Sequence, residues 1–308
     1  ADVIDGKGGT DTLSATLAAE SIRPTVKNVE KINFTATADT LNIDTRDITG
    51  VSTYTVESSA GAIKFNNLLT IPDFANNSGT AAVTINFQDS ALSGSADNLK
   101  ISLNNLQQTD TTNDVIEITD AGGTNKLETL TIDSTSLSST IDNLATTAVG
   151  TTTLSVTGDE ALAITDALDA EIATISAAAF TGGLTATVGI TTGATITTGS
   201  GNDVLTGAAG NDSFTSGAGD DTIVPVSGTD TVNAGAGNDT IQFDTETNLT
   251  KVDTIDGGAG TDAIEYTADT TATDDEDFTL VTNVEQITSS AGIQLKAITL
   301  GAKAQAAG

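Results

Sequence analysis

Apolar side chains recur along this chain with two different spacings, and each spacing predicts β-structure. Between residues 198 and 242 the sequence divides into five consecutive nonapeptides, TGSGNDVLT, GAAGNDSFT, SGAGDDTIV, PVSGTDTVN and AGAGNDTIQ, without a break in register. The eighth position of each is apolar and lies among mostly polar neighbours, which predicts a six-residue turn followed by a three-residue strand with one inward side chain. These apolar residues are Leu205, Phe214, Ile223, Val232 and Ile241.

Outside this tract, apolar and polar residues alternate over short segments rich in β-branched side chains, which predicts strands. The segments are 31–37, 39–44, 52–58, 82–87, 98–103, 127–133, 152–158, 161–165, 171–176 and 184–190. Short helices are predicted only for residues 136–144 and 165–172. Around the second range, Ile164, Leu168 and Ile172 recur at helical spacing, which packing in a core explains fully.

Two more positions of the nonapeptide are constant, glycine at position 4 and aspartate at position 6. Glycine permits a positive φ, and two nonapeptides close one coil, so that turns two repeats apart stack and Asp203 lies over Asp221. The pattern is G-G-x-G-x-D-x-U-x, the calcium repeat. Oxygen ligands in a flexible arrangement favour Ca²⁺ over Mg²⁺. The sequence therefore predicts an all-β chain with a parallel β-roll that binds Ca²⁺.

The candidate calcium ligands are the aspartates and the residues of the turns. The aspartates at position 6 are Asp203, Asp212, Asp221, Asp230 and Asp239. The turn residues are Gly199, Gly201, Asn202, Gly210, Asn211, Gly217, Gly219, Asp220, Gly235, Gly237 and Asn238. Asp230 matches least well, because Pro225 and Val226 precede it where glycine is usual. Two alternatives stay open: position 5 supports the turn rather than the metal, and the Gly-Asn-Asp runs are ordinary turn residues.

Further nonapeptides flank the tract. After an insertion at residues 243–247 come NLTKVDTID and GGAGTDAIE, and near the start ADVID matches the end of a unit that GKGGTDTLS follows. The candidate ligands that these units add are Asp253, Asp262, Gly258, Gly260, Asp2 and Asp11. Because the chain begins in mid-repeat, we expect a fragment of a longer protein with more repeats upstream.

The organisation of the chain follows from these units. Residues 257–289 echo residues 6–36, each with a glycine-aspartate repeat, a spacer and then N-V-E-x-I. The looser rungs that start at Asp39, Asp97 and Asp114 favour turn or strand-entry roles over metal binding. Four segments are expected: 1–14 as the end of an upstream repeat tract, 15–197 as a Thr/Ser-rich β-domain, 198–265 as the calcium-binding β-roll, and 266–308 as a truncated β module and tail.

Composition narrows the chemistry. The chain has no Cys, Met, Trp or His, which removes disulfides, thiolates, imidazole ligands and the usual general base. The formal net charge is −31, and no Lys or Arg lies between Lys126 and Lys251, which argues against nucleic acid and anionic membranes as partners. No apolar run reaches the roughly 20 residues that span a bilayer. We expect no enzyme, although a glycosidase that uses only carboxylates stays open.

With these motifs, the chain resembles RTX-type proteins and, more narrowly, the calcium-dependent surface-layer (S-layer) proteins of Gram-negative bacteria, the Caulobacter type. LETLTIDSTSLSSTIDNL, TTLSVTGDEALAIT and ATITTGSGNDVLTG carry the narrower likeness within residues 127–206. The resemblance implies an RTX β-roll continuous with an irregular β-solenoid or β-rich region with few short helices. It also implies type I secretion, folding as the chain meets Ca²⁺, and self-assembly into a two-dimensional lattice on the cell surface.

The resemblance also implies lipopolysaccharide as a partner, through a region not recognisable in this chain. Two other functions stay open. One is a calcium-stiffened extender or binding module of an RTX adhesin. The other is the C-terminal RTX portion of a secreted enzyme, for which the sequence offers no nucleophile elbow, triad or zinc motif.

Overall fold

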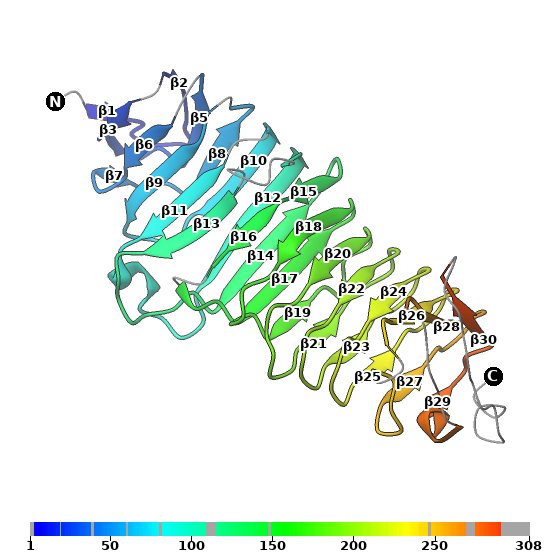
Figure 1. Cartoon of the computed structure of the whole chain (residues 1–308). Coiled ribbons are helices and arrows are strands. Elements are labelled where there is room, and N and C mark those ends of the chain that lie inside the picture. The colour runs from blue at the N-terminus through cyan, green and yellow to red at the C-terminus, as the bar shows by residue number, and fades with distance from the viewer. Residues whose placement is uncertain are drawn as a thin grey trace. The chain divides into compact units, whose positions relative to one another are not determined.

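The computed structural model describes residues 3–18, 20–37, 40–59, 61–79, 82–108, 115–146, 149–245, 248–268 and 275–290. The chain forms two compact units, unit 1 (Ala1–Glu171) and unit 2 (Ile172–Gly308). Each unit is a parallel β-solenoid, in which strands from successive coils lie side by side (Figure 1). The predicted all-β class and parallel coil are therefore confirmed. The four segments expected from the sequence remain predictions.

Unit 1 has long strands that pair in parallel between successive coils. One sheet has the order β2 (Thr12–Leu17), β5 (Lys31–Ala36), β8 (Thr53–Glu57), β10 (Asp73–Gly79), β12 (Asn98–Leu106), β14 (Thr129–Ser134) and β17 (Thr153–Gly158). A second has the order β3 (Ser21–Ile22), β6 (Leu41–Asp44), β9 (Ile63–Leu68), β11 (Val83–Phe87), β13 (Val115–Asp120) and β16 (Asn143–Ala145). Shorter ladders join β1 (Val3–Asp5), β4 (Thr25–Lys27) and β7 (Ile48–Thr49), and β15 (Ser139–Ile141) and β18 (Leu162–Ala167).

Unit 2 has shorter strands, which alternate between two sheets. One has the order β19 (Thr174–Ser176), β21 (Thr195–Thr197), β23 (Ser213–Thr215), β25 (Thr231–Asn233), β27 (Thr254–Asp256) and β29 (Val281–Thr282). The other has the order β20 (Leu184–Thr187), β22 (Val204–Thr206), β24 (Thr222–Val224), β26 (Thr240–Phe243), β28 (Ala263–Tyr266) and β30 (Gln286–Ser289). Alternate nonapeptides thus pair, so that Leu205 lies beside Ile223 in neighbouring coils, as the repeat predicts.

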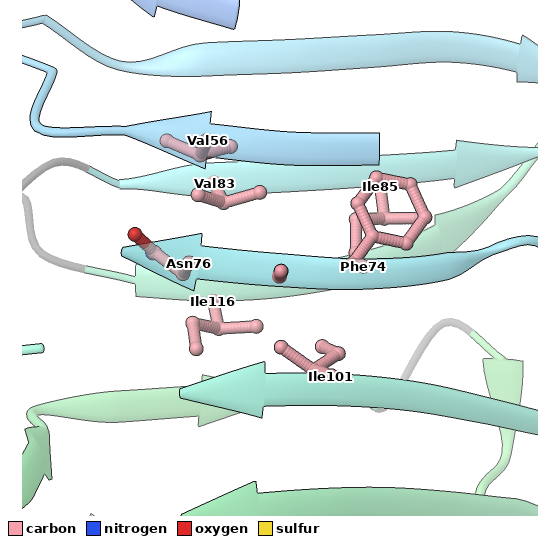
Figure 2. Close-up of a pocket in the computed structure, with 8 residues that line it drawn as sticks. Val56, Phe74, Asn76, Val83, Ile85, Ile101 and Ile116 are labelled. Atoms are coloured by element: carbon pink, nitrogen blue, oxygen red, sulfur yellow. The ribbon is translucent and has the colours of Figure 1, made fainter. Parts of the chain in front are cut away.

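The core of unit 1 contains an aromatic cluster. The ring centroids of Tyr54 and Phe65 lie 5.1 Å apart, and those of Phe65 and Phe74 lie 5.0 Å apart. Figure 2 shows a cavity beside Phe74 and Asn76, lined mainly by aliphatic side chains. Its volume is about 10 Å³, close to the space that one water molecule needs, so it is a packing feature of the core and not a ligand site.

The core of unit 2 is much thinner. Each three-residue strand contributes one inward side chain, and the apolar residues at position 8 are at most 1% exposed. Those of the five central repeats are Leu205, Phe214, Ile223, Val232 and Ile241. Fully burying one such side chain contributes about 1.5–3 kcal/mol, whereas ordering each residue's backbone costs about 1–2 kcal/mol. One apolar residue in nine leaves little margin from hydrophobic burial alone.

The helix predictions were wrong. Residues 139–141 and 143–145 are strands β15 and β16, and residues 162–167 are strand β18, followed by a turn. Ile164, Leu168 and Ile172 are nevertheless at most 2% exposed, because strand and turn side chains that point into the coil reproduce a helical spacing. Short 3₁₀ helices occur instead at η1 (Asp89–Leu92) and η3 (Asp275–Phe278). No helix in the described ranges has the length and apolarity to cross a membrane.

Candidate metal sites in unit 2

The position-6 aspartates of unit 2 form two ladders, each along one series of stacked turns. The "long ladder" consists of Asp203, Asp221, Asp239 and Asp262. The "short ladder" consists of Asp212, Asp230 and Asp253. Every one of these side chains is at most 2% exposed. The stacking predicted from the two-repeat coil is therefore confirmed, including the aspartates that follow the insertion.

Backbone amides hold one oxygen of each aspartate in the long ladder. The N–H of Asp203 donates to Oδ1 of Asp221, Asp221 N–H to Asp239, and Asp239 N–H to Asp262, each at 2.8 Å. Leu184 N–H donates to Oδ1 of Asp203 at 2.7 Å and starts the series. Each side chain is consequently fixed between its own turn and the turn before it.

The second oxygen of each long-ladder aspartate has no such partner. Oδ2 is buried and makes no hydrogen bond in any of the four residues. Buried polar atoms are nearly always paired, and an unpaired buried carboxylate is costly. A row of buried, unshared carboxylate oxygens at successive turns is therefore the arrangement that a bound cation would satisfy.

The short ladder differs in how its second oxygens are used. Oδ1 follows the same rule, because Asp212 N–H donates to Asp230 and Asp230 N–H donates to Asp253, both at 2.8 Å. However, Oδ2 of Asp212 accepts the N–H of Ala208 at 3.0 Å, and Oδ2 of Asp253 accepts the N–H of Thr250 at 2.7 Å. Only Asp230 in this ladder keeps a buried, unpaired Oδ2. The residue expected to match least well thus has the same unshared oxygen as the long ladder.

The backbone at position 2 goes with this difference. Gly217, Gly235 and Gly258 have φ of 97°, 104° and 93°, and Val226 has φ of 77°. In each of these repeats, Oδ2 of the aspartate at position 6 is unpaired. Ala208 is outside the left-handed region and instead turns its N–H toward Asp212. A left-handed position 2 therefore leaves the carboxylate oxygen unshared, even where a β-branched residue must adopt it at a cost of about 1–2 kcal/mol.

Glycine at position 4 allows successive turns to approach closely. A Cβ on Gly219 would lie 2.5 Å from the carbonyl oxygen of Gly201, and one on Gly237 would lie 2.0 Å from that of Gly219. Both glycines have positive φ, as predicted. Gly201 does not, which corrects the expectation for that residue, and it requires glycine because a Cβ would lie 2.3 Å from the carbonyl carbon of Gly182.

Burial changes the protonation of both ladders. It raises the pKa of Asp221, Asp230 and Asp239 from 3.8 to about 6, and the charges of neighbouring acidic residues add to the effect. Burial also raises the pKa of Asp203, Asp212 and Asp262. Desolvation penalises the charged form, so without a cation these carboxyls favour protonation, whereas a cation would favour the ionised form.

The position-5 residues form a separate, exposed ladder. Oδ1 of Asn202 accepts the N–H of Asp220 at 3.0 Å, and Oδ1 of Asp220 accepts the N–H of Asn238 at 2.7 Å. Asn211 accepts the N–H of Thr229 in the other series of turns. These contacts support the interpretation of position 5 as a turn-stabilising position.

The donor set fits a hard cation. In the described ranges, no three Asp, Glu, His or Cys side chains converge on one point. A cation would therefore be held by carboxylates of stacked turns together with backbone carbonyl oxygens of the glycine turns, a set made only of oxygen. Such a set suits Ca²⁺ and offers no nitrogen or sulfur for transition metals.

The candidates in unit 1 fall into three groups. Asp11 keeps a buried, unpaired Oδ2, as in the long ladder. Oδ2 of Asp97 accepts the N–H of Gly94 at 3.0 Å, which agrees with the turn role expected for it. Asp2, Asp39 and Asp114 lie outside the described residues. Sequence reasoning gave no role to Glu285, which accepts the N–H of Asp262, although the repeated N-V-E-x-I pattern was a signal for it.

Comparison with known proteins agrees with this geometry. The RTX calcium-binding nonapeptide repeat matches the chain in four copies, over residues 190–223, 226–242 and 251–269. No curated protein and no solved structure matches the chain. Unit 2 therefore contains RTX calcium-binding repeats, as predicted, and such repeats indicate a protein secreted by a Gram-negative bacterium.

Proposed function

We propose that this chain is a structural, non-catalytic segment of a secreted S-layer protein that folds on binding Ca²⁺ and assembles into a lattice at the cell surface. The row of unshared Oδ2 atoms in Asp203, Asp221, Asp239 and Asp262 carries the calcium-dependent part. Four buried carboxylates in consecutive turns oppose folding until cations neutralise them. Binding free energy then becomes folding free energy.

The charge of the chain supports the same sequence of events. With a formal net charge of −31, the chain repels other copies of itself where calcium is scarce. Outside the cell, bound calcium would reduce this repulsion within and between copies. The lattice, the type I export and lipopolysaccharide as anchoring partner rest on the resemblance of residues 127–206 to S-layer proteins.

The test is a calcium titration of the whole chain, with magnesium as the control ion. Circular dichroism follows β-structure, light scattering follows assembly, and electron microscopy examines the products. We expect β-structure to appear cooperatively with calcium but not magnesium, and scattering to rise afterwards. A chain that is fully folded in chelator and indifferent to calcium would contradict the calcium-dependent function.

A second function is a calcium-stiffened extender in an adhesin. It is favoured by the way unit 2 grows, because each added pair of nonapeptides repeats the same parallel pairing of alternate strands. Such a segment would bind calcium and fold but remain monomeric. Ordered sheets in the micrographs support the lattice, whereas a folded monomer at millimolar calcium supports the extender.

A further inference from the structure

Glu285 continues the long ladder beyond the last aspartate. Its Oε2 accepts the N–H of Asp262 at 2.7 Å, just as Oδ1 of Asp262 accepts the N–H of Asp239 at 2.8 Å. Both contacts join residues 23 positions apart. Glu285 lies outside the residues that the RTX repeat matches, which end at residue 269. The final rung of the ladder is therefore a glutamate.

A cradle for a cation lies between Asp262 and this rung. Asp262 is 0% exposed, and its Oδ2 has no hydrogen-bond partner. A Cβ on Gly257 would lie 2.9 Å from this Oδ2 and 1.9 Å from the carbonyl oxygen of Asn283. Two oxygen atoms from different turns thus converge beside the Cα of Gly257, in space that any other residue would fill.

Neighbouring contacts fix the carbonyl group in this cradle. Asn283 is left-handed, with φ of 53°, and its Nδ2 donates to Oδ1 of Asp256 at 2.7 Å. The same Oδ1 accepts the N–H of Gly258 at 3.1 Å. Besides burial, the charges of Glu285 and Asp256 raise the pKa of Asp262, which shows that three acidic groups act on one place.

Unit 1 contains the same arrangement with its own residues. Oε2 of Glu30 accepts the N–H of Asp11 at 2.8 Å, and Oδ2 of Asp11 is buried without a partner. A Cβ on Gly6 would lie 2.7 Å from this Oδ2 and 2.0 Å from the carbonyl oxygen of Asn28. Asn28 also has φ of 53°, and its Nδ2 donates to Oδ1 of Asp5 at 2.9 Å. Two separate parts of the chain thus build one constellation.

A third aspartate-glutamate pair lacks the cradle. Oε2 of Glu128 accepts the N–H of Asp97 at 2.8 Å, so the rung itself is the same. Oδ2 of Asp97, however, accepts the N–H of Gly94 at 3.0 Å. With both oxygens of Asp97 in use or near donors, this pair has a structural role and provides an internal control.

We propose that Glu285 and Glu30 each close a calcium site, with Asp262 and Asp11 respectively, at rungs where glutamate replaces the ladder aspartate. Each site would combine the unshared aspartate Oδ2, the asparagine carbonyl oxygen of the cradle and the glutamate carboxylate, an oxygen set suited to Ca²⁺. This inference rests on the proposed calcium-dependent function. It assigns ligands that lie outside the nonapeptides, and for Glu30 a site in the other unit.

The test counts calcium ions on the full chain by native mass spectrometry, for the wild type and for E285Q, E30Q and E128Q. Glutamine keeps a carbonyl oxygen to accept the aspartate N–H but removes the charge. A purely structural glutamate would therefore tolerate the change. We expect E285Q and E30Q each to bind one ion fewer than the wild type, and E128Q to bind the wild-type number.

The near-ultraviolet circular dichroism of the two tyrosines verifies that each variant is folded. If E285Q fails to fold, E30Q still decides the question in unit 1. Retention of the wild-type ion count by folded E285Q and E30Q overturns the proposal, while a wild type that binds calcium leaves the proposed function standing. A wild type that binds no calcium overturns both.

Discussion

Units 1 and 2 use the same parallel coil but obtain their stability from different sources. Unit 1 has strands of up to nine residues, such as β12, and a cluster of aromatic side chains. Most strands of unit 2 have three residues, and its coils enclose buried aspartates. The comparison teaches that a solenoid rung can be short only if something other than apolar burial holds the turns together. In unit 2, we propose that calcium does so.

The largest expected effect is the response to chelation. Removing calcium should unfold unit 2 and leave unit 1 folded, because the unshared carboxylates occur in successive turns of unit 2. The chain has only two tyrosines, Tyr54 in unit 1 and Tyr266 in unit 2. Near-ultraviolet circular dichroism of Y266F and Y54F therefore reports each unit separately in the full chain. Loss of both signals at the same calcium concentration would contradict the comparison.

The next effect concerns pH in calcium-free buffer. Because the folded-state pKa of Asp221, Asp230 and Asp239 is raised to about 6, their protonated forms favour the folded state. This stability is fully present below the unfolded-state value near 3.8 and is lost as pH rises through 6. Each pKa unit corresponds to about 1.4 kcal/mol, so the three carboxyls together supply several kcal/mol.

The melting temperature of unit 2, followed by Tyr266 in Y54F, should accordingly be higher at pH 5 than at pH 7.5 without calcium. With calcium the order should reverse, because the ions bind the ionised carboxylates. The Tyr54 signal of unit 1 provides the control and should change less. A calcium-free unit 2 that gains stability from pH 5 to pH 7.5 would disagree with the buried ladders.

A smaller effect separates the two ladders within unit 2. In chelator, D239N should stabilise the fold, because it removes a buried charge while its carbonyl oxygen still accepts the N–H of Asp221. D212N should destabilise it, because Asp212 accepts from both Ala194 and Ala208 and an asparagine has only one acceptor oxygen. Each change is expected to be about 1–3 kcal/mol. Urea unfolding measures both, and effects of the same sign would contradict the assignment.

The smallest effect is at Val226. Its φ of 77° is a left-handed conformation that glycine adopts at the equivalent position of neighbouring repeats. V226G should therefore raise the free energy of unfolding of unit 2 by about 1 kcal/mol with calcium present. The matched control is G235A, which should destabilise because a Cβ there would lie 2.0 Å from the carbonyl oxygen of Gly217. A destabilised V226G would show that the valine side chain contributes more than its backbone strain costs.

Much of the candidate site could be predicted from the sequence because the repeat is local and periodic. Turn, strand and ladder positions recur every nine residues, so the stacking of Asp203 on Asp221 follows from counting once two repeats form a coil. Which carboxylate oxygens remain unshared could not be predicted. That depends on whether the N–H of a residue such as Ala208 points at the aspartate, and hence on backbone angles that the repeat pattern does not contain.

The sequence by itself determined the fold class, the register of the nonapeptides and the calcium-binding type of repeat, because each rests on residue types at short, regular spacing. Only the tertiary structure decided the rest. It showed that the helical spacing near Leu168 belongs to a strand and a turn, that the two ladders differ, and that Glu30 and Glu285 reach aspartates of the preceding rung. These contacts join residues 19 and 23 positions apart, across spacers of different sequence, where no local pattern connects them.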